Sequence, residues 1–112
     1  YITGIITYQN KYFLIQNPPG GLLENLYGFV QYDVESPYSF VSSFQEEYQQ
    51  NLIIQAHIKD IKHVFSHRTW RMHVYHFILD KEIENMYTLE EINQLPLSTA
   101  HMKALKAYLS SF

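Results

Sequence analysis

The chain of 112 residues contains no cysteine. Disulfide bonds, thiolate zinc sites, iron–sulfur ligation and cysteine nucleophiles are therefore excluded within it. No apolar run approaches the roughly 20 residues that a transmembrane helix needs, and no signal peptide is recognisable. These absences fit the reducing cytoplasm, so we expect a cytoplasmic location without contact with a membrane.

Charge is also scarce, since charged residues make up 17% of the chain and the formal net charge is −3. A freestanding nucleic-acid-binding domain normally has a basic field, because phosphate neutralisation supplies most of its affinity. Any contact with DNA is therefore expected to be local and to depend on a second domain. Apolar residues reach 46% of the chain, which indicates a globular domain with a core. The chain begins at Tyr1 inside an apolar segment, and we expect residues 1–112 to be one domain excised from a longer protein.

Periodicity and capping signals predict the order β-β-loop-β-α-β-β-α-α. The expected strands cover residues 2–8, 11–15, 27–32, 52–58, 61–65 and 71–79. The expected helices run from Ser36-Pro37 to about Asn51, from the Thr88 capping box through Leu95, and onward from a Ser98 cap. This order predicts an α+β layer fold, in which a mixed sheet packs between helices.

Three local details are also expected from the sequence. Gln9-Asn10 should form a hairpin turn with the asparagine at positive φ, and Lys59-Asp60 should form a bend or bulge between two strands. On the last helix, Lys103 and Lys106 should face outward. The apolar residues expected to face inward on that helix are Met102, Leu105, Tyr108 and Leu109.

A polar, partly basic tip separates two long apolar segments in the middle of the chain. Phe65 ends the first segment, and Ser66-His67-Arg68-Thr69-Trp70-Arg71 follows before the second begins. A strand pair is a rigid mount, and the tip of a hairpin presents side chains to a partner. The alternative is an ordinary solvated turn.

One helical segment, residues 42–49, resembles the helical part of a Nudix box, whose carboxylates hold magnesium in Nudix hydrolases. The family's helix reads Arg-Glu-apolar-x-Glu-Glu-x-Gly. Glu46 and Glu47 are retained here, but Ser42 and Ser43 stand in place of the Arg and the first Glu, and Gln49 stands in place of the Gly. At the position of the upstream Glu stands Val34. Adjacent carboxylates point about 100° apart on a helix, so the match supports the fold and argues against hydrolysis. The alternative for the two glutamates is a solvated helix face.

Four of the six histidines cluster at positions 63, 67, 73 and 76. A zinc site needs three or four ligands that converge on one point. His73 and His76 are three residues apart on a strand and should point to opposite faces, so we expect hydrogen-bonded histidines and no metal site. Ser66 and His67 are adjacent, which does not place the imidazole on the hydroxyl, and no nucleophile elbow is present. We therefore expect no catalytic residue in this chain.

Several segments in order resemble the C-terminal domain of the A/G-specific adenine DNA glycosylases, the MutY family. The segments are Lys11-Tyr12-Phe13-Leu14-Ile15-Gln16, Gly21-Leu22-Leu23-Glu24-Asn25-Leu26-Tyr27-Gly28-Phe29, Phe65-Ser66-His67 and Leu95-Pro96-Leu97-Ser98. In that family the Gly-Leu-Leu segment usually continues Gly-Leu-Trp-Glu-Phe-Pro. Here Tyr27 replaces the Trp, and the Glu and Pro around Phe29 are lost.

The resemblance implies a Nudix-like domain without Nudix hydrolysis. It implies that a separate N-terminal domain carries a 4Fe-4S cluster and excises adenine, whereas this chain holds no cofactor and recognises 8-oxoguanine in the opposite strand. The implied partners are double-stranded DNA with an 8-oxoguanine:adenine pair and the chain's own N-terminal domain. The chain is expected to be a monomer associated with the nucleoid.

The tip would then read the lesion, because oxidation turns the N7 acceptor of guanine into an N–H donor. The Ser66 hydroxyl accepts and donates hydrogen bonds and could read that N–H. His67 would support the loop or bond the lesion or a phosphate, and Phe65 would anchor the tip in the core. Arg68, Thr69 and Arg71 are candidate phosphate contacts.

Two other functions remain open from the sequence. The first is a Nudix pyrophosphohydrolase acting on a nucleotide such as an oxidised purine triphosphate. The second is a non-catalytic protein-interaction module, which the ten tyrosines and the low charge favour.

Overall fold

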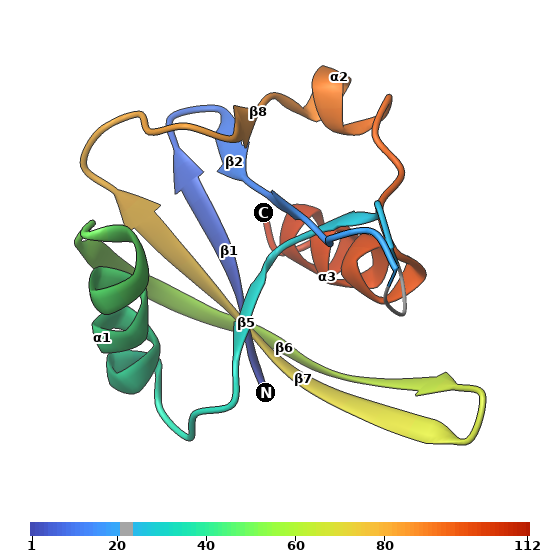
Figure 1. Ribbon diagram of the computed structural model, residues 1–112. Helices are drawn as coiled ribbons and strands as arrows, with labels where there is room; N and C mark the ends of the chain where they lie inside the picture. The colour runs from blue at the N-terminus through green and yellow to red at the C-terminus, as the bar shows by residue number, and fades with distance from the viewer. Residues whose placement is uncertain (21–23) are drawn as a thin grey trace.

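The structure is a computed structural model that describes residues 1–20 and 24–112, except for the side chain of Phe65. Residues 21–23, where the expected Gly-Leu-Leu segment falls, lie outside the described residues. The elements follow one another along the chain as Figure 1 shows. They are β1 (Ile2–Tyr8), β2 (Lys11–Phe13), β3 (Ile15–Gln16), β4 (Tyr27–Gly28), β5 (Val30–Tyr32), α1 (Pro37–Tyr48), β6 (Leu52–Phe65), β7 (Arg68–Leu79), β8 (Met86–Tyr87), α2 (Leu89–Ile92) and α3 (Thr99–Leu109).

The main sheet has the order β6-β7-β1-β2-β8, and β5 pairs with β1 off this path. β1 and β7 are parallel, whereas the other neighbours are antiparallel. β3 and β4 form a separate two-stranded sheet. Figure 1 shows α1 on one side of the central strands and α3 on the other. The predicted α+β fold, a mixed sheet between helices, is confirmed.

Alternating side chains of the central strands divide the core into two clusters. Met72 and Val74 of β7 belong to the cluster that includes α3 residues. Phe77 and Leu79 belong to the cluster that includes α1 residues. The α1 side is packed closely at Gly4, where a Cβ atom would lie 2.4 Å from Cζ of Phe40 on α1. A β-strand sends successive side chains to opposite faces, so one strand supplies both clusters.

Most element positions agree with the sequence, with local differences in the strands. The predicted strand 11–15 is interrupted at Leu14, whose amide donates to the carbonyl of Asn85 at 3.1 Å. The predicted strand 27–32 is interrupted at the buried Phe29. The turn after β1 has its positive φ at Gln9 instead of Asn10. In each case a tertiary contact or turn geometry overrides strand propensity.

The irregularity expected at Lys59-Asp60 is displaced along β6. The strand is continuous from Leu52 to Phe65, and its register against β7 shifts between Ile54 and Ala56 and again between His57 and Lys59. Such extra residues bend a strand and increase its twist. The hairpin therefore curves without breaking.

Each helix begins at its predicted cap. The Ser36 side chain accepts from the Ser39 amide, Thr88 forms a capping box, and the Ser98 side chain accepts from the His101 amide. α1 ends at Tyr48, earlier than predicted, because Gln49 turns into the left-handed region. α2 ends at Ile92, also earlier than predicted.

The buried face of α3 differs in part from the prediction. Leu105 and Tyr108 are buried, and Lys103 and Lys106 are exposed, as expected. The inward placement of Met102 and Leu109 was wrong, since both side chains are more than 40% exposed. The remaining buried positions are Ala100, His101 and Ala104. Small residues and one imidazole let α3 lie close to the sheet.

Candidate nucleic-acid interface

The β6–β7 hairpin ends in a two-residue turn that carries Ser66. Strand pairing continues to Phe65 opposite Arg68, so the second strand begins three residues earlier than predicted. Ser66 has φ of 54°, a left-handed conformation that costs a non-glycine residue roughly 1–2 kcal/mol. Two-residue hairpin turns require positive φ at the first loop position and favour glycine there. The turn geometry accounts for this φ, and it holds Ser66 at the outermost point of the hairpin.

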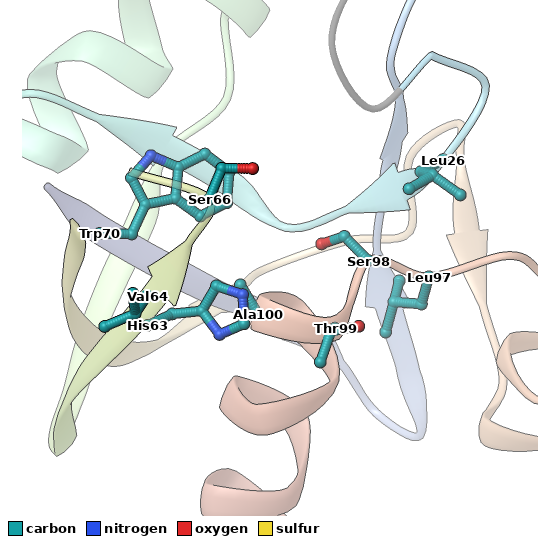
Figure 2. Close-up of a pocket in the computed structure, with 9 residues that line it drawn as sticks. All are labelled: Leu26, His63, Val64, Ser66, Trp70, Leu97, Ser98, Thr99 and Ala100. Atoms are coloured by element: carbon teal, nitrogen blue, oxygen red, sulfur yellow. The ribbon is translucent and has the colours of Figure 1, made fainter. Parts of the chain in front are cut away.

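A groove of about 390 Å³ opens beside the hairpin tip and reaches the start of α3. Figure 2 shows its side chains, which come from the hairpin, from the segment before β4 and from the N-terminal end of α3. We call it the tip groove. It is lined by Leu26, His63, Val64, Ser66, Trp70, Leu97, Ser98, Thr99 and Ala100.

The structure separates the predicted site residues. Ser66 lines the tip groove, whereas His67 is exposed in the turn and does not line it. Arg68, Thr69 and Arg71 are exposed on β7. Because strand residues alternate between faces, Thr69 and Arg71 share one face of the hairpin and Arg68 lies on the other. The side chain of Phe65, expected to anchor the tip, lies outside the described residues.

Trp70 and His63 are the groove residues that the sequence did not single out. They are paired across the hairpin, and directly opposite side chains lie on the same face. The imidazole Nδ1 of His63 lies 2.9 Å from Nζ of Lys103 on α3. The only tryptophan of the chain, inside the predicted tip, was the available signal for an aromatic contact surface.

Behind the groove, His101 joins α3 to the strand segment after β4. Its Nδ1 accepts the Phe29 amide hydrogen at 2.9 Å, and its ring centroid lies 6.4 Å from that of Trp70. Burial lowers the pKa of His101 to about 4, so the imidazole is neutral at pH 7 with its proton on Nε2. A Cβ atom at Gly28 would lie 3.2 Å from this ring. The groove therefore has a fixed inner wall.

Three further histidines, His57, His73 and His76, have polar partners, which agrees with the sequence-based expectation for His73 and His76. Nε2 of His76 lies 2.8 Å from Oγ1 of Thr7, and burial lowers the pKa of this histidine. His57 and His73 each place a ring nitrogen 2.8 Å from the same Asp60 carboxylate oxygen. Within the described part of the chain, no group of three or more His, Asp or Glu side chains is placed to hold a metal ion.

The helix that resembles a Nudix helix presents its two glutamates to solvent. Glu46 and Glu47 are exposed on α1. Oε1 of Glu47 accepts a 2.5 Å hydrogen bond from the Tyr32 hydroxyl. Burial, and secondly this bond, raises the pKa of Tyr32, so the phenol stays protonated and donates. One of the two carboxylates is thus engaged in joining α1 to β5.

Charge is strongly segregated over the molecule, which the net value of −3 conceals. The β6–β7 hairpin and α3 contain six of the eight Lys and Arg residues but only one of the eleven Asp and Glu residues. Their formal charge is +5, whereas that of the rest of the chain is −8. The low net charge therefore describes the whole chain, and the concentration of positive charge on the hairpin and α3 agrees with the expectation that any contact with DNA is local.

Solved structures of other proteins share this fold. A NUDIX hydrolase from Nitrosomonas europaea aligns with a TM-score of 0.72 and 11% identity, covering 98% of this chain and 87% of that one. The C-terminal domain of mouse MUTYH, solved in complex with human PCNA, aligns with a TM-score of 0.68 and 17% identity, covering 98% of this chain and 86% of that one. A MutT protein of the Nudix hydrolase family from methicillin-resistant Staphylococcus aureus 252 aligns with a TM-score of 0.67 and 20% identity, covering 99% of this chain and 95% of that one. Two Nudix-family proteins and the C-terminal domain of MUTYH therefore share this architecture.

Sequence comparison places the chain in one family. No curated protein sequence matches it. None of the helices described in the structure is long and apolar enough to cross a membrane. The profile of the NUDIX domain matches residues 2–107, which is nearly the whole chain. The chain belongs to the NUDIX domain family.

Proposed function

We propose that this chain is a DNA-lesion-recognition domain that reads 8-oxoguanine opposite adenine, while a separate domain excises the adenine. The observation that supports this most is Ser66, held at positive φ on a hairpin tip and lining the tip groove. The ordered resemblance to the adenine glycosylase domain agrees with it. In this role the domain would act in the cytoplasm on nucleoid DNA.

The chemistry of the tip groove suits an oxidised guanine. Oxidation replaces the N7 acceptor of guanine by an N–H donor, and the Ser66 hydroxyl can accept from that donor. Trp70 supplies an aromatic surface in the same groove, and bases stack on such surfaces with roughly 1–3 kcal/mol each. In this proposal the Ser66 hydroxyl distinguishes 8-oxoguanine from guanine, and the Trp70 indole adds binding affinity that does not depend on the identity of the base.

The remaining tip residues would hold the DNA backbone. Arg68 shares the Trp70 face of the hairpin, whereas Thr69 and Arg71 lie on the other face, so the two sets would contact different phosphates. His67 is exposed in the turn and could reach the lesion or a phosphate. Contacts of this kind position a protein on DNA without reading sequence.

The first experiment measures binding of the 112-residue chain to two duplexes that differ only in 8-oxoguanine or guanine opposite adenine. Wild type is compared with Ser66→Ala, which removes the hydroxyl, and with Ser66→Gly, which also relieves the backbone strain. Both variants should lose the preference for the oxidised duplex, by roughly 5- to 150-fold, because one base-specific contact is worth about 1–3 kcal/mol. Fluorescence anisotropy measures both dissociation constants.

Ser42→Ala is the matched control, since Ser42 is an exposed serine on α1. It should keep the preference of wild type. If the Ser66 variants also keep it, the tip does not read the lesion and the proposal fails. In that case a protein-interaction module becomes the better proposal, and hairpin amides should not respond to lesion DNA in NMR spectra.

A second candidate function is nucleotide pyrophosphohydrolysis, favoured by the family and by Glu46 and Glu47 on α1. It requires carboxylates that converge on magnesium. Phosphate release from an oxidised purine triphosphate, with and without magnesium, tests it. Hydrolysis that depends on magnesium and is lost in Glu46→Gln would favour this function over lesion recognition.

A further inference from the structure

A second and larger groove, of about 670 Å³, lies between β6 and α3. β6 ends the order of the main sheet, so no further strand of the described structure covers its outer edge. The lining comes from two stretches far apart in sequence. They are Ile58, Lys59, Asp60, Ile61 and Lys62 on β6, and Lys103, Lys106, Ala107, Ser110 and Ser111 in and after α3. We call it the lysine groove.

Four lysines line this groove, two from each wall. Lys59 and Lys62 are exposed on β6, and Lys103 and Lys106 are exposed one turn apart on α3. Residues three apart on a helix are neighbours on its surface. None of the four forms an ion pair with a carboxylate within the described residues, although Lys11 elsewhere does so with Glu82. Because side chains alternate along a strand, Lys59 shares the α3 side of the sheet with its partner Val74, whereas Lys62 lies at the rim on the other face with its partner Arg71. The ammonium groups of Lys59, Lys103 and Lys106 on one open groove make a site for a polyanion.

The one carboxylate in the lining does not neutralise these lysines. Asp60 directs one oxygen to two imidazoles, Nδ1 of His73 and Nε2 of His57, each at 2.8 Å. The hydrogen bond from His73, followed by that from His57, holds the pKa of Asp60 below its usual value. Asp60 therefore stays ionised at pH 7 but forms no ion pair with a lysine, and the described lining keeps an excess of positive charge.

The lysine groove continues the tip groove along the same strand. The Lys103–His63 contact of 2.9 Å joins the two, because Lys103 lines one and His63 the other. Lys59 on β6 and Ser66 in the turn that follows it are seven residues apart, a span of about 23 Å at roughly 3.3 Å per strand residue. That length matches about seven nucleotides at about 3.4 Å per strand position of duplex DNA.

We infer that the lysine groove binds the phosphodiester backbone of double-stranded DNA on one side of the base held at Ser66. Lysine ammonium groups are point charges with flexible stems and lack the planar fork that reads base edges. The contact is therefore independent of sequence and of the lesion. The identity of the polyanion as DNA rests on the proposed function, whereas the site itself rests on the lysines of its lining.

The test compares three double variants that each remove two positive charges. Lys59→Gln/Lys62→Gln and Lys103→Gln/Lys106→Gln alter the two walls, and Lys11→Gln/Lys81→Gln alters lysines outside the groove. Anisotropy with an undamaged 20-base-pair duplex gives the slope of log K against log salt from 50 to 200 mM. The α3-wall variant should reduce the slope by about 1.8 and the β6-wall variant by at least about 0.9, at about 0.9 per phosphate contact. The α3-wall variant should also bind at least tenfold more weakly at 50 mM. The control pair should change the slope by less than about 0.5.

A fourth protein with all four lysines changed to arginine should keep the slope of wild type, which separates charge from a change in fold. The inference is overturned if the wall variants keep the wild-type slope, if the control pair lowers it equally, or if wild type does not bind the duplex at 50 mM salt. Lesion preference separates the two proposals. A wall variant with a reduced salt slope and an unchanged preference for 8-oxoguanine supports the lysine groove as a DNA contact. A Ser66→Ala variant that loses the preference but keeps the salt slope supports lesion recognition alone.

Discussion

The two faces of the central sheet are built differently. On the α1 face, large aromatic side chains fill the space, and the rings of Phe40 and Phe77 stack with centroids 4.4 Å apart. On the α3 face, the buried surface of the helix consists of Ala100, His101, Ala104, Leu105 and Tyr108, and two grooves open between that helix and the hairpin. Both faces contain a core cluster, but we expect the α1 face to contribute more to stability, and the grooves of the α3 face form the proposed binding surface.

Charge follows the same division. Glu46 and Glu47 lie on α1, whereas four exposed lysines on β6 and α3 line the groove between these two elements. A domain with net charge −3 therefore has a cationic region and an anionic remainder. Such a distribution would orient the molecule during the proposed approach to DNA.

Truncation of Phe44 should give the largest effect on stability and so test the role of the α1 face. Phe44→Ala should lower the free energy of unfolding by about 3–5 kcal/mol, because a fully buried phenyl ring leaves a cavity. Trp70→Ala on the other face should cost less stability, since its indole is only half-buried, yet weaken DNA binding. Urea denaturation and anisotropy measure the two quantities. Equal stability losses, with no loss of DNA binding in Trp70→Ala, would contradict the division.

The next largest effect concerns His101 and pH. Burial lowers its folded-state pKa to about 4, while the unfolded chain has a pKa near 6.5. The unfolded chain thus binds more protons between these values, and stability falls as pH drops from about 6.5 toward 4, by at most about 3 kcal/mol.

His101→Asn tests this, because the asparagine Oδ1 can still accept from the Phe29 amide. Its free energy of unfolding should depend less on pH than that of wild type over this range. His76, whose pKa is also lowered by burial, is present in both proteins and cancels in the difference. Parallel pH profiles of the two proteins would show that His101 is protonated without penalty.

Smaller effects are expected at two residues that share left-handed backbone but lie in the two contrasting regions. Gln49 ends α1 and Ser66 forms the hairpin tip, with φ of 56° and 54°. Gln49→Gly and Ser66→Gly should each stabilise the fold by roughly 0.5–1 kcal/mol, because glycine tolerates positive φ. Only Ser66→Gly should alter DNA binding. Thermal unfolding measures the change in stability, and anisotropy measures the change in DNA binding. Together they distinguish backbone strain that only ends a helix, at Gln49, from strain that positions a DNA-contacting hydroxyl, at Ser66.

The smallest effect is expected on the acidic face. Glu46→Gln/Glu47→Gln should leave the DNA dissociation constant and its salt slope within about twofold of wild type, because these exposed carboxylates lie on α1 and not at either groove. Stability should fall by about 1 kcal/mol at most through weakening of the Tyr32–Glu47 hydrogen bond. Tighter DNA binding by more than tenfold would show that the two regions are electrostatically coupled.

Helices and strands were predictable where the signals are local. Ser36, Thr88 and Ser98 mark their helices, and apolar segments mark β1 and β7. The breaks at Leu14 and Phe29 were not predictable, because the Leu14 amide donates to a loop carbonyl and the Phe29 amide donates to the His101 imidazole. Local signals therefore fixed the elements, and tertiary contacts fixed their interruptions.

The candidate site was predictable only in part. The hairpin tip and Ser66 follow from neighbouring residues, so sequence reasoning reached them. Both grooves depend on the approach of α3 to β6, where Lys103 and His63 meet across 40 residues of chain. The net charge gives no hint of this local concentration of lysines, and alternation along β7 divides Arg68 from Arg71. Three-dimensional proximity, and not residue type, decides which charges act together.

The open edge of β6 has one further consequence. An unpaired strand edge is a template on which another chain can add a strand, and natural proteins oppose this with lysines and bulges. β6 has Lys59, Lys62 and two register shifts along its length. The side chains that we propose hold phosphate therefore also discourage self-association and aggregation of the free domain, and a bound duplex would shield the same edge.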